Sequence, residues 1–116
     1  MKKGLTKEEA IRRHRIMWEW IANETLKRKE CVTETEALDF FGWNPRTIFS
    51  YEWCCEYAHG VCYHCPIAWP SKDIHIACVN YYGNGLYDLW NKSVERDDWR
   101  TAAYYALYIS MLPERK

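Results

Sequence analysis

The sequence carries no net charge, because its sixteen basic and sixteen acidic side chains cancel. A chain without a net field attracts nucleic acid or an acidic membrane only through a local patch. It also lacks any run of about 18 apolar residues, the length that a membrane-spanning helix requires. The basic residues 1–7 lead directly into Glu8 and Glu9 rather than into an apolar segment, a pattern that excludes a secretory signal. We therefore expect a cytoplasmic protein.

Several catalytic motifs are absent as well. A zinc nucleobase deaminase needs a His-x-Glu element and a Pro-Cys-x-x-Cys, but Val61 precedes the Cys-x-x-Cys and no His-x-Glu occurs. The chain has no HExxH motif, no phosphate-binding glycine loop and no βαβ pattern around a redox Cys-x-x-Cys. A metal-dependent nuclease of the His-Asn-His type would have to use His75, Asn80 and Asn84. These residues match that motif only weakly. We predict no catalytic residues.

The composition is unusually rich in aromatic residues. They make up 16% of the chain, with seven Trp and nine Tyr, and apolar residues make up 48%. Such a composition excludes disorder, because so much apolar surface would not stay in water. A length of 116 residues fits one core, so we expect residues 1–116 to form a single domain.

The first helix is expected over about 7–29. Thr6 and Glu9 have the spacing of a capping box at its start. A 3.6-residue period places one stripe toward the core: Ala10, Ile11, His14, Met17, Trp18, Ile21, Ala22 and Thr25. Ile16 and Trp20 lie on the opposite side. Either a second layer packs on them or they form an exposed apolar spot for a partner, and we favour packing.

Two shorter helices are expected over 34–41 and 86–94. Thr33 and Glu36 form a second capping box before the first of them, and Gly42 ends it. The second carries on one side Leu86, Leu89 and Trp90.

A final helix is expected over 98–112, with Asp97 or Asp98 as its cap and Pro113 after its end. One of its stripes consists of small residues: Ala102, Ala103, Ala106 and Ser110. Small residues let another helix approach closely, and the first helix is the natural partner. The expected fold is therefore mainly α. It is a small helical domain in which the long N-terminal helix packs on the C-terminal helix, with an irregular zinc-knuckle loop region in the middle.

That middle segment, residues 43–85, has no convincing helix pattern. It shows only weak strand signals, at 47–49 and 74–79. A connection of this length is uncommon in a small domain unless something holds it in place. Five of the six cysteines fall within 54–78, and Cys62 and Cys65 have the spacing at which two thiolates bind one metal ion. Both observations predict a structural zinc site.

Structural zinc takes four ligands from Cys and His, and the predicted set is Cys55, Cys62, Cys65 and Cys78. Adjacent cysteines rarely bind one ion together, so Cys54 is the narrow alternative to Cys55. His75 is the strongest substitute ligand. Two other interpretations stay open: a disulfide framework, which a reducing compartment disfavours, and ordinary buried thiols. Cys31, outside the cluster, is most simply a buried small apolar residue.

Several segments carry a resemblance to known proteins: AIRRHRIMWEWIA at 10–22, CEY at 55–57, CYHCPIAWP at 62–70, Cys78, LYDLW at 86–90 and LPER at 112–115. Together they resemble small, uncharacterised proteins encoded by phages and prophages of low-GC Gram-positive bacteria. In that group a cysteine often stands three residues before the Cys-Glu-Tyr. Here that position is Glu52, and Cys54 is out of register. The resemblance implies a phage accessory protein and implies no reaction.

The expected function is that of a zinc-stabilised, non-enzymatic module that binds, and can thereby inhibit, a host protein in host takeover or counter-defence. Trp and Tyr dominate binding hot spots, and the candidate contacts are Trp20, Trp53, Tyr57, Trp69, Tyr81 and Tyr82. For most of them, packing in the core or a loop is the competing interpretation. The alternative is binding or sequestering of single-stranded nucleic acid or nucleotides, with these aromatics as stacking platforms and arginines of the first helix on phosphates.

Overall fold

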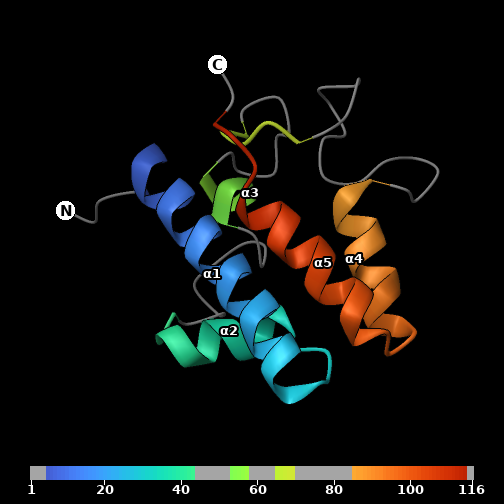
Figure 1. Cartoon of the computed structure of the whole chain (residues 1–116). Coiled ribbons are helices and arrows are strands. Elements are labelled where there is room, and N and C mark those ends of the chain that lie inside the picture. Colours follow the sequence, from blue (N-terminus) through green and yellow to red (C-terminus); the bar gives the residue numbers. More distant parts are fainter. Residues whose placement is uncertain (1–4, 44–52, 58–64, 70–84, 115–116) are drawn as a thin grey trace.

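The described residues are mainly α-helical, which confirms the predicted fold class. The computed structural model describes residues 5–43, 53–57, 65–69 and 85–114, without the side chains of residues 55 and 56. The helices in these ranges are α1 (Lys7–Arg28), α2 (Glu34–Phe41), α3 (Trp53–Tyr57), α4 (Leu86–Glu95) and α5 (Trp99–Ser110) (Figure 1). β-structure within the same ranges is limited to an isolated bridge between Ile67 and Glu114.

Helix α1 begins at the predicted residue and ends one residue earlier than predicted. The hydroxyl of Thr6 accepts a 3.1 Å hydrogen bond from the backbone N–H of Glu9. At the other end Lys29 adopts a left-handed conformation with φ of 56°, which closes the helix. The buried residues of α1 are those of the predicted stripe: Ala10, Ile11, His14, Met17, Trp18, Ile21, Ala22 and Thr25. Local periodicity was therefore sufficient to identify the core face of this helix.

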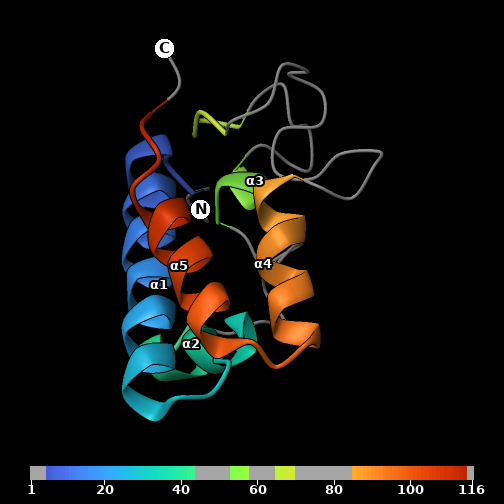
Figure 2. The same ribbon diagram turned by 45° about the vertical axis from the view of Figure 1, so that its right-hand side comes forward.

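Helices α1 and α5 pack side by side and antiparallel, as the small-residue stripe predicts (Figures 1 and 2). The buried face of α5 consists of Ala102, Ala103, Ala106, Ile109 and Ser110. His14 of α1 is fully buried, and its Nε2 donates a 3.0 Å hydrogen bond to the backbone carbonyl of Ile109. This carbonyl lies in the last turn of α5, where carbonyls lack the usual intrahelical partner. His14 thus ties the end of α5 to α1.

Helix α4 packs against α5, and Trp18 of α1 reaches it through the core. The Trp18 ring meets Trp90 edge to face at 4.8 Å between centroids and Tyr87 at 6.1 Å. The Tyr87 hydroxyl in turn donates a hydrogen bond to the buried carboxylate of Glu34 at the start of α2. Trp18 therefore links α1 to α4, and Tyr87 links α4 to α2.

Helix α4 ends at Glu95, one residue later than predicted, and α5 ends earlier than predicted. Asp98, rather than Asp97, caps α5: its Oδ1 accepts a 3.3 Å hydrogen bond from the backbone N–H of Thr101. Helix α5 stops at Ser110, before the predicted end at residue 112. The reason is Pro113, which disfavours a helical conformation in the residue before it, so the chain leaves the helix early.

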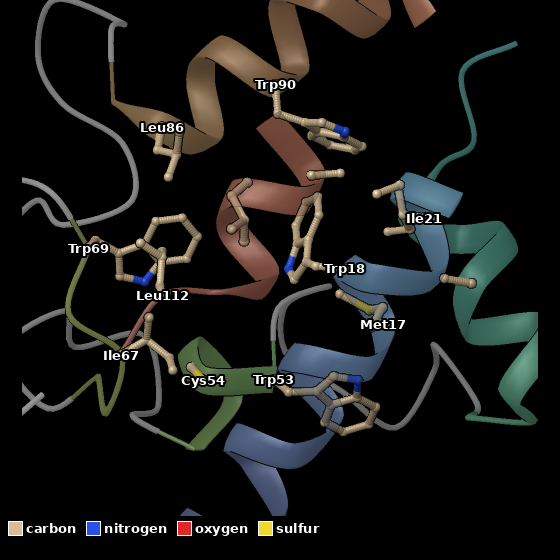
Figure 3. Close-up of a cluster of buried hydrophobic side chains, with 14 of the residues drawn as sticks. Met17, Trp18, Ile21, Trp53, Cys54, Ile67, Trp69, Leu86, Trp90 and Leu112 are labelled. Atoms are coloured by element: carbon tan, nitrogen blue, oxygen red, sulfur yellow. The ribbon is translucent and has the colours of Figure 1, made fainter. Parts of the chain in front are cut away.

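The described part of the middle segment belongs to the core. Figure 3 shows Trp53, Cys54, Ile67 and Trp69 in the same cluster of buried side chains as Trp18. The backbone also holds this part in place, since the N–H of Ala68 donates a 2.9 Å hydrogen bond to the carbonyl of Pro113. The residues that follow α5 therefore fasten part of the middle segment onto the helices.

Helix α3 corrects the prediction that residues 43–85 contain no helix. It has five residues, Trp53–Tyr57, and packs on α1. A single turn is too short to show a 3.6-residue period, so its sequence carries no signal of it. An isolated turn is also unstable in water, and burial of Trp53 and Cys54 supplies the stabilisation that local propensity lacks. The predicted strand segments 47–49 and 74–79 lie outside the described residues.

Candidate functional site

The predicted zinc ligands are only partly described. Cys65 is buried, and Cys54, the alternative ligand, is fully buried in the core beside Ile67 (Figure 3). The side chain of Cys55 and the whole of Cys62, Cys78 and His75 lie outside the described residues. In the described ranges alone, no group of three or more His, Cys, Asp or Glu is placed to hold a metal ion. The zinc site therefore remains a prediction.

The surroundings of Cys54 bear on the choice between the adjacent cysteines. Its Sγ lies 3.8 Å from the backbone carbonyl oxygen of Ala10, in the geometry of a thiol that donates a hydrogen bond. Zinc binds the thiolate, which has no proton to donate. Cys54 therefore cannot donate in this contact and bind zinc at the same time.

The predicted contact residues fall into different environments. Trp53 and Trp69 are core residues, with 4% and 6% of their surface exposed, so they offer a partner almost nothing to touch. This burial corrects the prediction that Trp53 and Trp69 contact a partner. Each ring fills space between elements, and the Trp69 ring packs edge to face on His14 at 5.8 Å. Tyr57 is half-buried at the end of α3, and Tyr81 and Tyr82 lie outside the described residues.

Of the candidates that the structure describes, Trp20 lies in a cluster of partly exposed aromatic rings, which we call the aromatic surface: Trp20, Phe40, Phe41 and Trp43. Phe40 stacks on Trp20 at 4.7 Å with an interplanar angle of 27°, and Phe41 stacks on Trp43 at 4.6 Å and 20°. The two stacks meet where Phe40 and Phe41 pack edge to face at 5.0 Å. Helix α2 thus packs on the Trp20 side of α1 and leaves rings partly open to solvent.

Arginines border the aromatic surface at both ends. The guanidinium of Arg28 lies 5.8 Å from the Trp20 ring centroid. That of Arg13 lies 5.2 Å from the Trp43 centroid and 4.6 Å from that of Trp53, so it joins the surface to the core. Cation–π contacts of this kind hold the rings in place and are worth roughly 0.5–1 kcal/mol at exposed sites.

Both arginines are also paired with carboxylates. Arg13 Nε lies 2.9 Å from Glu9 Oε1, and Arg28 Nη2 lies 3.0 Å from Glu24 Oε1. Hydrogen bonds from Arg12 and then from Arg13 lower the pKa of Glu9 from 4.5 to about 2, so this carboxylate stays ionised at neutral pH. The positive charges beside the aromatic surface are therefore largely neutralised.

The end of α2 gives the aromatic surface its shape. Gly42 takes a left-handed φ of 72°, and the N–H of Trp43 then bonds back to the carbonyl of Leu38 at 2.8 Å. This reversal of the chain, a Schellman motif, is what returns the Trp43 ring to Phe41. Sequence reasoning identified Gly42 as the helix stop but missed Phe40, Phe41 and Trp43 as surface residues. The available signal was that Phe40 lies off the buried side of α2, formed by Glu34, Ala37 and Leu38.

Replacement of Gly42 tests this geometry. A Cβ at position 42 would meet no atom within 4 Å, so the only cost of Gly42→Ala is the left-handed backbone. We expect a loss of about 1–2 kcal/mol in the free energy of unfolding, measured by urea denaturation. Lys29→Gly is the matched variant, because Lys29 already has a φ of 56°, and it should raise stability. A Gly42→Ala protein as stable as wild type would contradict the described turn.

No known protein family, curated protein or solved structure matches this chain. Among the described helices none is both long and apolar enough to cross a membrane.

Proposed function

We propose that this chain is a phage-type accessory protein that acts by binding a host protein through the aromatic surface of α1 and α2. The phage origin rests on the sequence resemblance, and so does the proposed location in the cytoplasm of an infected or lysogenic bacterium. The binding role rests on the surface itself.

The main support for the proposal is the exposure of Phe40. It has 62% of its surface exposed, although it stacks on Trp20 in a row of rings that continues into the core. An exposed ring on a rigid support loses little conformational entropy when a partner covers it, which is the property of a binding hot spot. Phe40 is not needed to fill the core, because Ala37 and Leu38 form the buried side of α2.

The charges beside the surface favour a protein partner over nucleic acid. Phosphate binding requires basic groups that neutralise the backbone, and it gains affinity from a positive field. Here Arg13 and Arg28 already pair with glutamates, and the whole chain has no net charge. Aromatic rings with a rim of paired charges resemble the centre and edge of a protein–protein interface.

Structural zinc is part of the same proposal. Cys55, Cys62, Cys65 and Cys78 would hold the ion and so fasten the middle segment of the chain. The support is that Cys65 is buried and directly precedes Pro66 and Ile67, which are buried as well. Zinc would supply no chemistry in this role beyond holding these thiolates together.

A pull-down comparison tests the binding role. Wild-type protein and the variant Phe40→Glu are each used to capture proteins from a lysate of a low-GC Gram-positive bacterium. We expect one protein to be retained in stoichiometric amount by wild type and lost from the variant, whose affinity should fall by at least about thirtyfold. The matched control is Leu26→Glu, because Leu26 is an α1 residue with 50% of its surface exposed that lies outside the aromatic surface.

Two results would count against the proposal. One is that wild type retains no stoichiometric protein, and the other is that Phe40→Glu retains it as well as wild type does. Binding to a single-stranded oligonucleotide is measured in parallel as salt is raised. Affinity that falls steeply with salt and depends on Phe40 would assign the surface to nucleic acid instead.

A further inference from the structure

The residues that follow α5 lie beside the described end of the middle segment (Figure 1). We call residues 112–114 the strap and residues 65–69 the covered segment. The N–H of Ala68 donates a 2.9 Å hydrogen bond to the carbonyl of Pro113, and an isolated antiparallel bridge joins the two segments beside it. Within the parts of the chain that the structure describes, every backbone hydrogen bond from the covered segment to another element goes to the strap.

The strap itself is held by few contacts. Two of its residues, Pro113 and Glu114, are exposed. Glu114 forms a 2.6 Å ion pair with Lys7, in which 50% and 41% of the side-chain surfaces face solvent, and exposed pairs of this kind stabilise a structure only weakly. The guanidinium of Arg15 lies 3.5 Å from the carbonyl oxygen of Leu112, a long distance for a hydrogen bond. The buried side chain of Leu112 is therefore the main anchor of the strap.

The contacts that hold α1 on α5 lie within the helices. The small residues Ala102, Ala103 and Ala106 belong to the buried face of α5, which packs along α1. His14 of α1 bonds to the carbonyl of Ile109, before the strap begins. Parts of a protein with few buried contacts open at a lower free energy than the whole chain unfolds. The strap can therefore detach while α1 and α5 stay paired.

We propose that the strap is a latch, which opens and closes while the helices remain folded and so controls access to the covered segment. The covered segment begins with Cys65, which has 7% of its surface exposed. A metal ion or a thiol reagent reaches this thiol when the strap opens, without unfolding of α1 or α5. The latch does not require zinc at Cys65, because the contacts that close it come from the strap.

Amide hydrogen exchange at increasing urea concentration tests the latch. The amide of Ala68 should exchange through the local opening, at least about tenfold faster than the buried amides of Ala22 in α1 and Ala106 in α5, after correction for intrinsic rates. Its exchange should also depend less on urea, because the strap exposes less surface than unfolding of the chain does. An Ala68 amide that matches Ala22 and Ala106 in rate and urea dependence would overturn the proposal.

Two variants separate the local opening from unfolding of the whole chain. Ile21→Val, at a fully buried position of α1, should speed exchange at Ala106 about two- to tenfold and leave Ala68 unchanged, because Ile21 stays packed when the strap opens. Leu112→Ala removes the main anchor and should speed exchange at Ala68 by at least about thirtyfold. The latch is wrong if Ile21→Val speeds Ala68 as much as Ala106, or if Leu112→Ala leaves Ala68 unchanged.

Alkylation by iodoacetamide, followed by mass spectrometry, tests access to Cys65. Leu112→Ala should raise the rate at Cys65 by the same factor as the exchange of Ala68, and Ile21→Val should not raise it. Each rate is compared with that of wild type, so protection of the thiol by a bound metal ion cancels, and failure of the zinc proposal would leave these ratios unchanged. A rate at Cys65 that rises in Ile21→Val but not in Leu112→Ala would show that only unfolding of the helices exposes the thiol.

Discussion

The variant Trp18→Ala is expected to lose about 3–5 kcal/mol in its free energy of unfolding, the range for removal of a large buried aromatic side chain. Trp18 has no exposed surface and contacts Trp90 and Tyr87 edge to face. Because these rings belong to α4 and Trp18 to α1, the cavity would lie where the helices meet and could not collapse without moving one of them. Urea denaturation followed by far-UV circular dichroism gives the free energy directly.

The matched control for this prediction is Trp99→Ala. Trp99 lies in the first turn of α5, is only partly buried, and packs under the guanidinium of Arg100 at 5.0 Å. Its removal should cost about 1 kcal/mol, since part of its surface already faces water and it lies outside the core cluster. If both variants lost the same stability, the central position of Trp18 between the helices would be wrong.

Removal of zinc is expected to have a larger effect still, if the metal site has the proposed ligands. Structural zinc contributes on the order of 10 kcal/mol in small zinc domains, which is comparable with the whole stability of a protein of this size. The segment that the metal would fasten supplies Trp53, Ile67 and Trp69 to the core. Its release would therefore expose buried rings and lower the melting temperature of the whole chain, whether zinc is removed by a chelator or by Cys65→Ser.

Metal analysis and a second cysteine variant complete this test. The purified protein should contain about one zinc ion per chain. Cys31→Ser is the control, because burial, followed by the nearby Asp97 and Asp98, raises the pKa of the Cys31 thiol and keeps it protonated at neutral pH. That variant should keep its metal and unfold close to wild type. Metal-free protein with a stable Cys65→Ser variant would end the zinc proposal.

Much of the helical framework could be predicted from short stretches of sequence. A capping hydroxyl and the carboxylate three residues later lie within one helical turn, so Thr33 and Glu36 determine the start of α2 without help from the rest of the chain. The core face of α1 follows from the period of its own apolar residues. Pairing of α1 with α5 followed in turn, because small residues on one helix leave room for large ones on another.

The candidate surfaces could not be predicted in the same way. A tryptophan can have the same neighbours in the sequence whether it lies in a core or in a binding site. Only the positions of distant elements decide whether its ring is buried or exposed. Trp53 and Trp69 are buried because α1 and the C-terminal residues cover them, whereas Phe40, which stacks on Trp20 with one face, keeps 62% of its surface exposed. The same holds for α3, whose single turn exists because it is packed.

The sequence by itself thus determined α1, α2, α4 and α5, the caps that begin α1, α2 and α5, and the faces of α1 and α5 that enter the core, since each depends on residues a few positions apart. The tertiary structure alone decided which aromatic residues remain on the outside. It placed Trp20, Phe40, Phe41 and Trp43 together and left Tyr104, Leu107, Tyr108 and Met111 exposed. Exposure is a property of what packs against a residue, and packing between distant elements is not encoded in any short stretch of the chain.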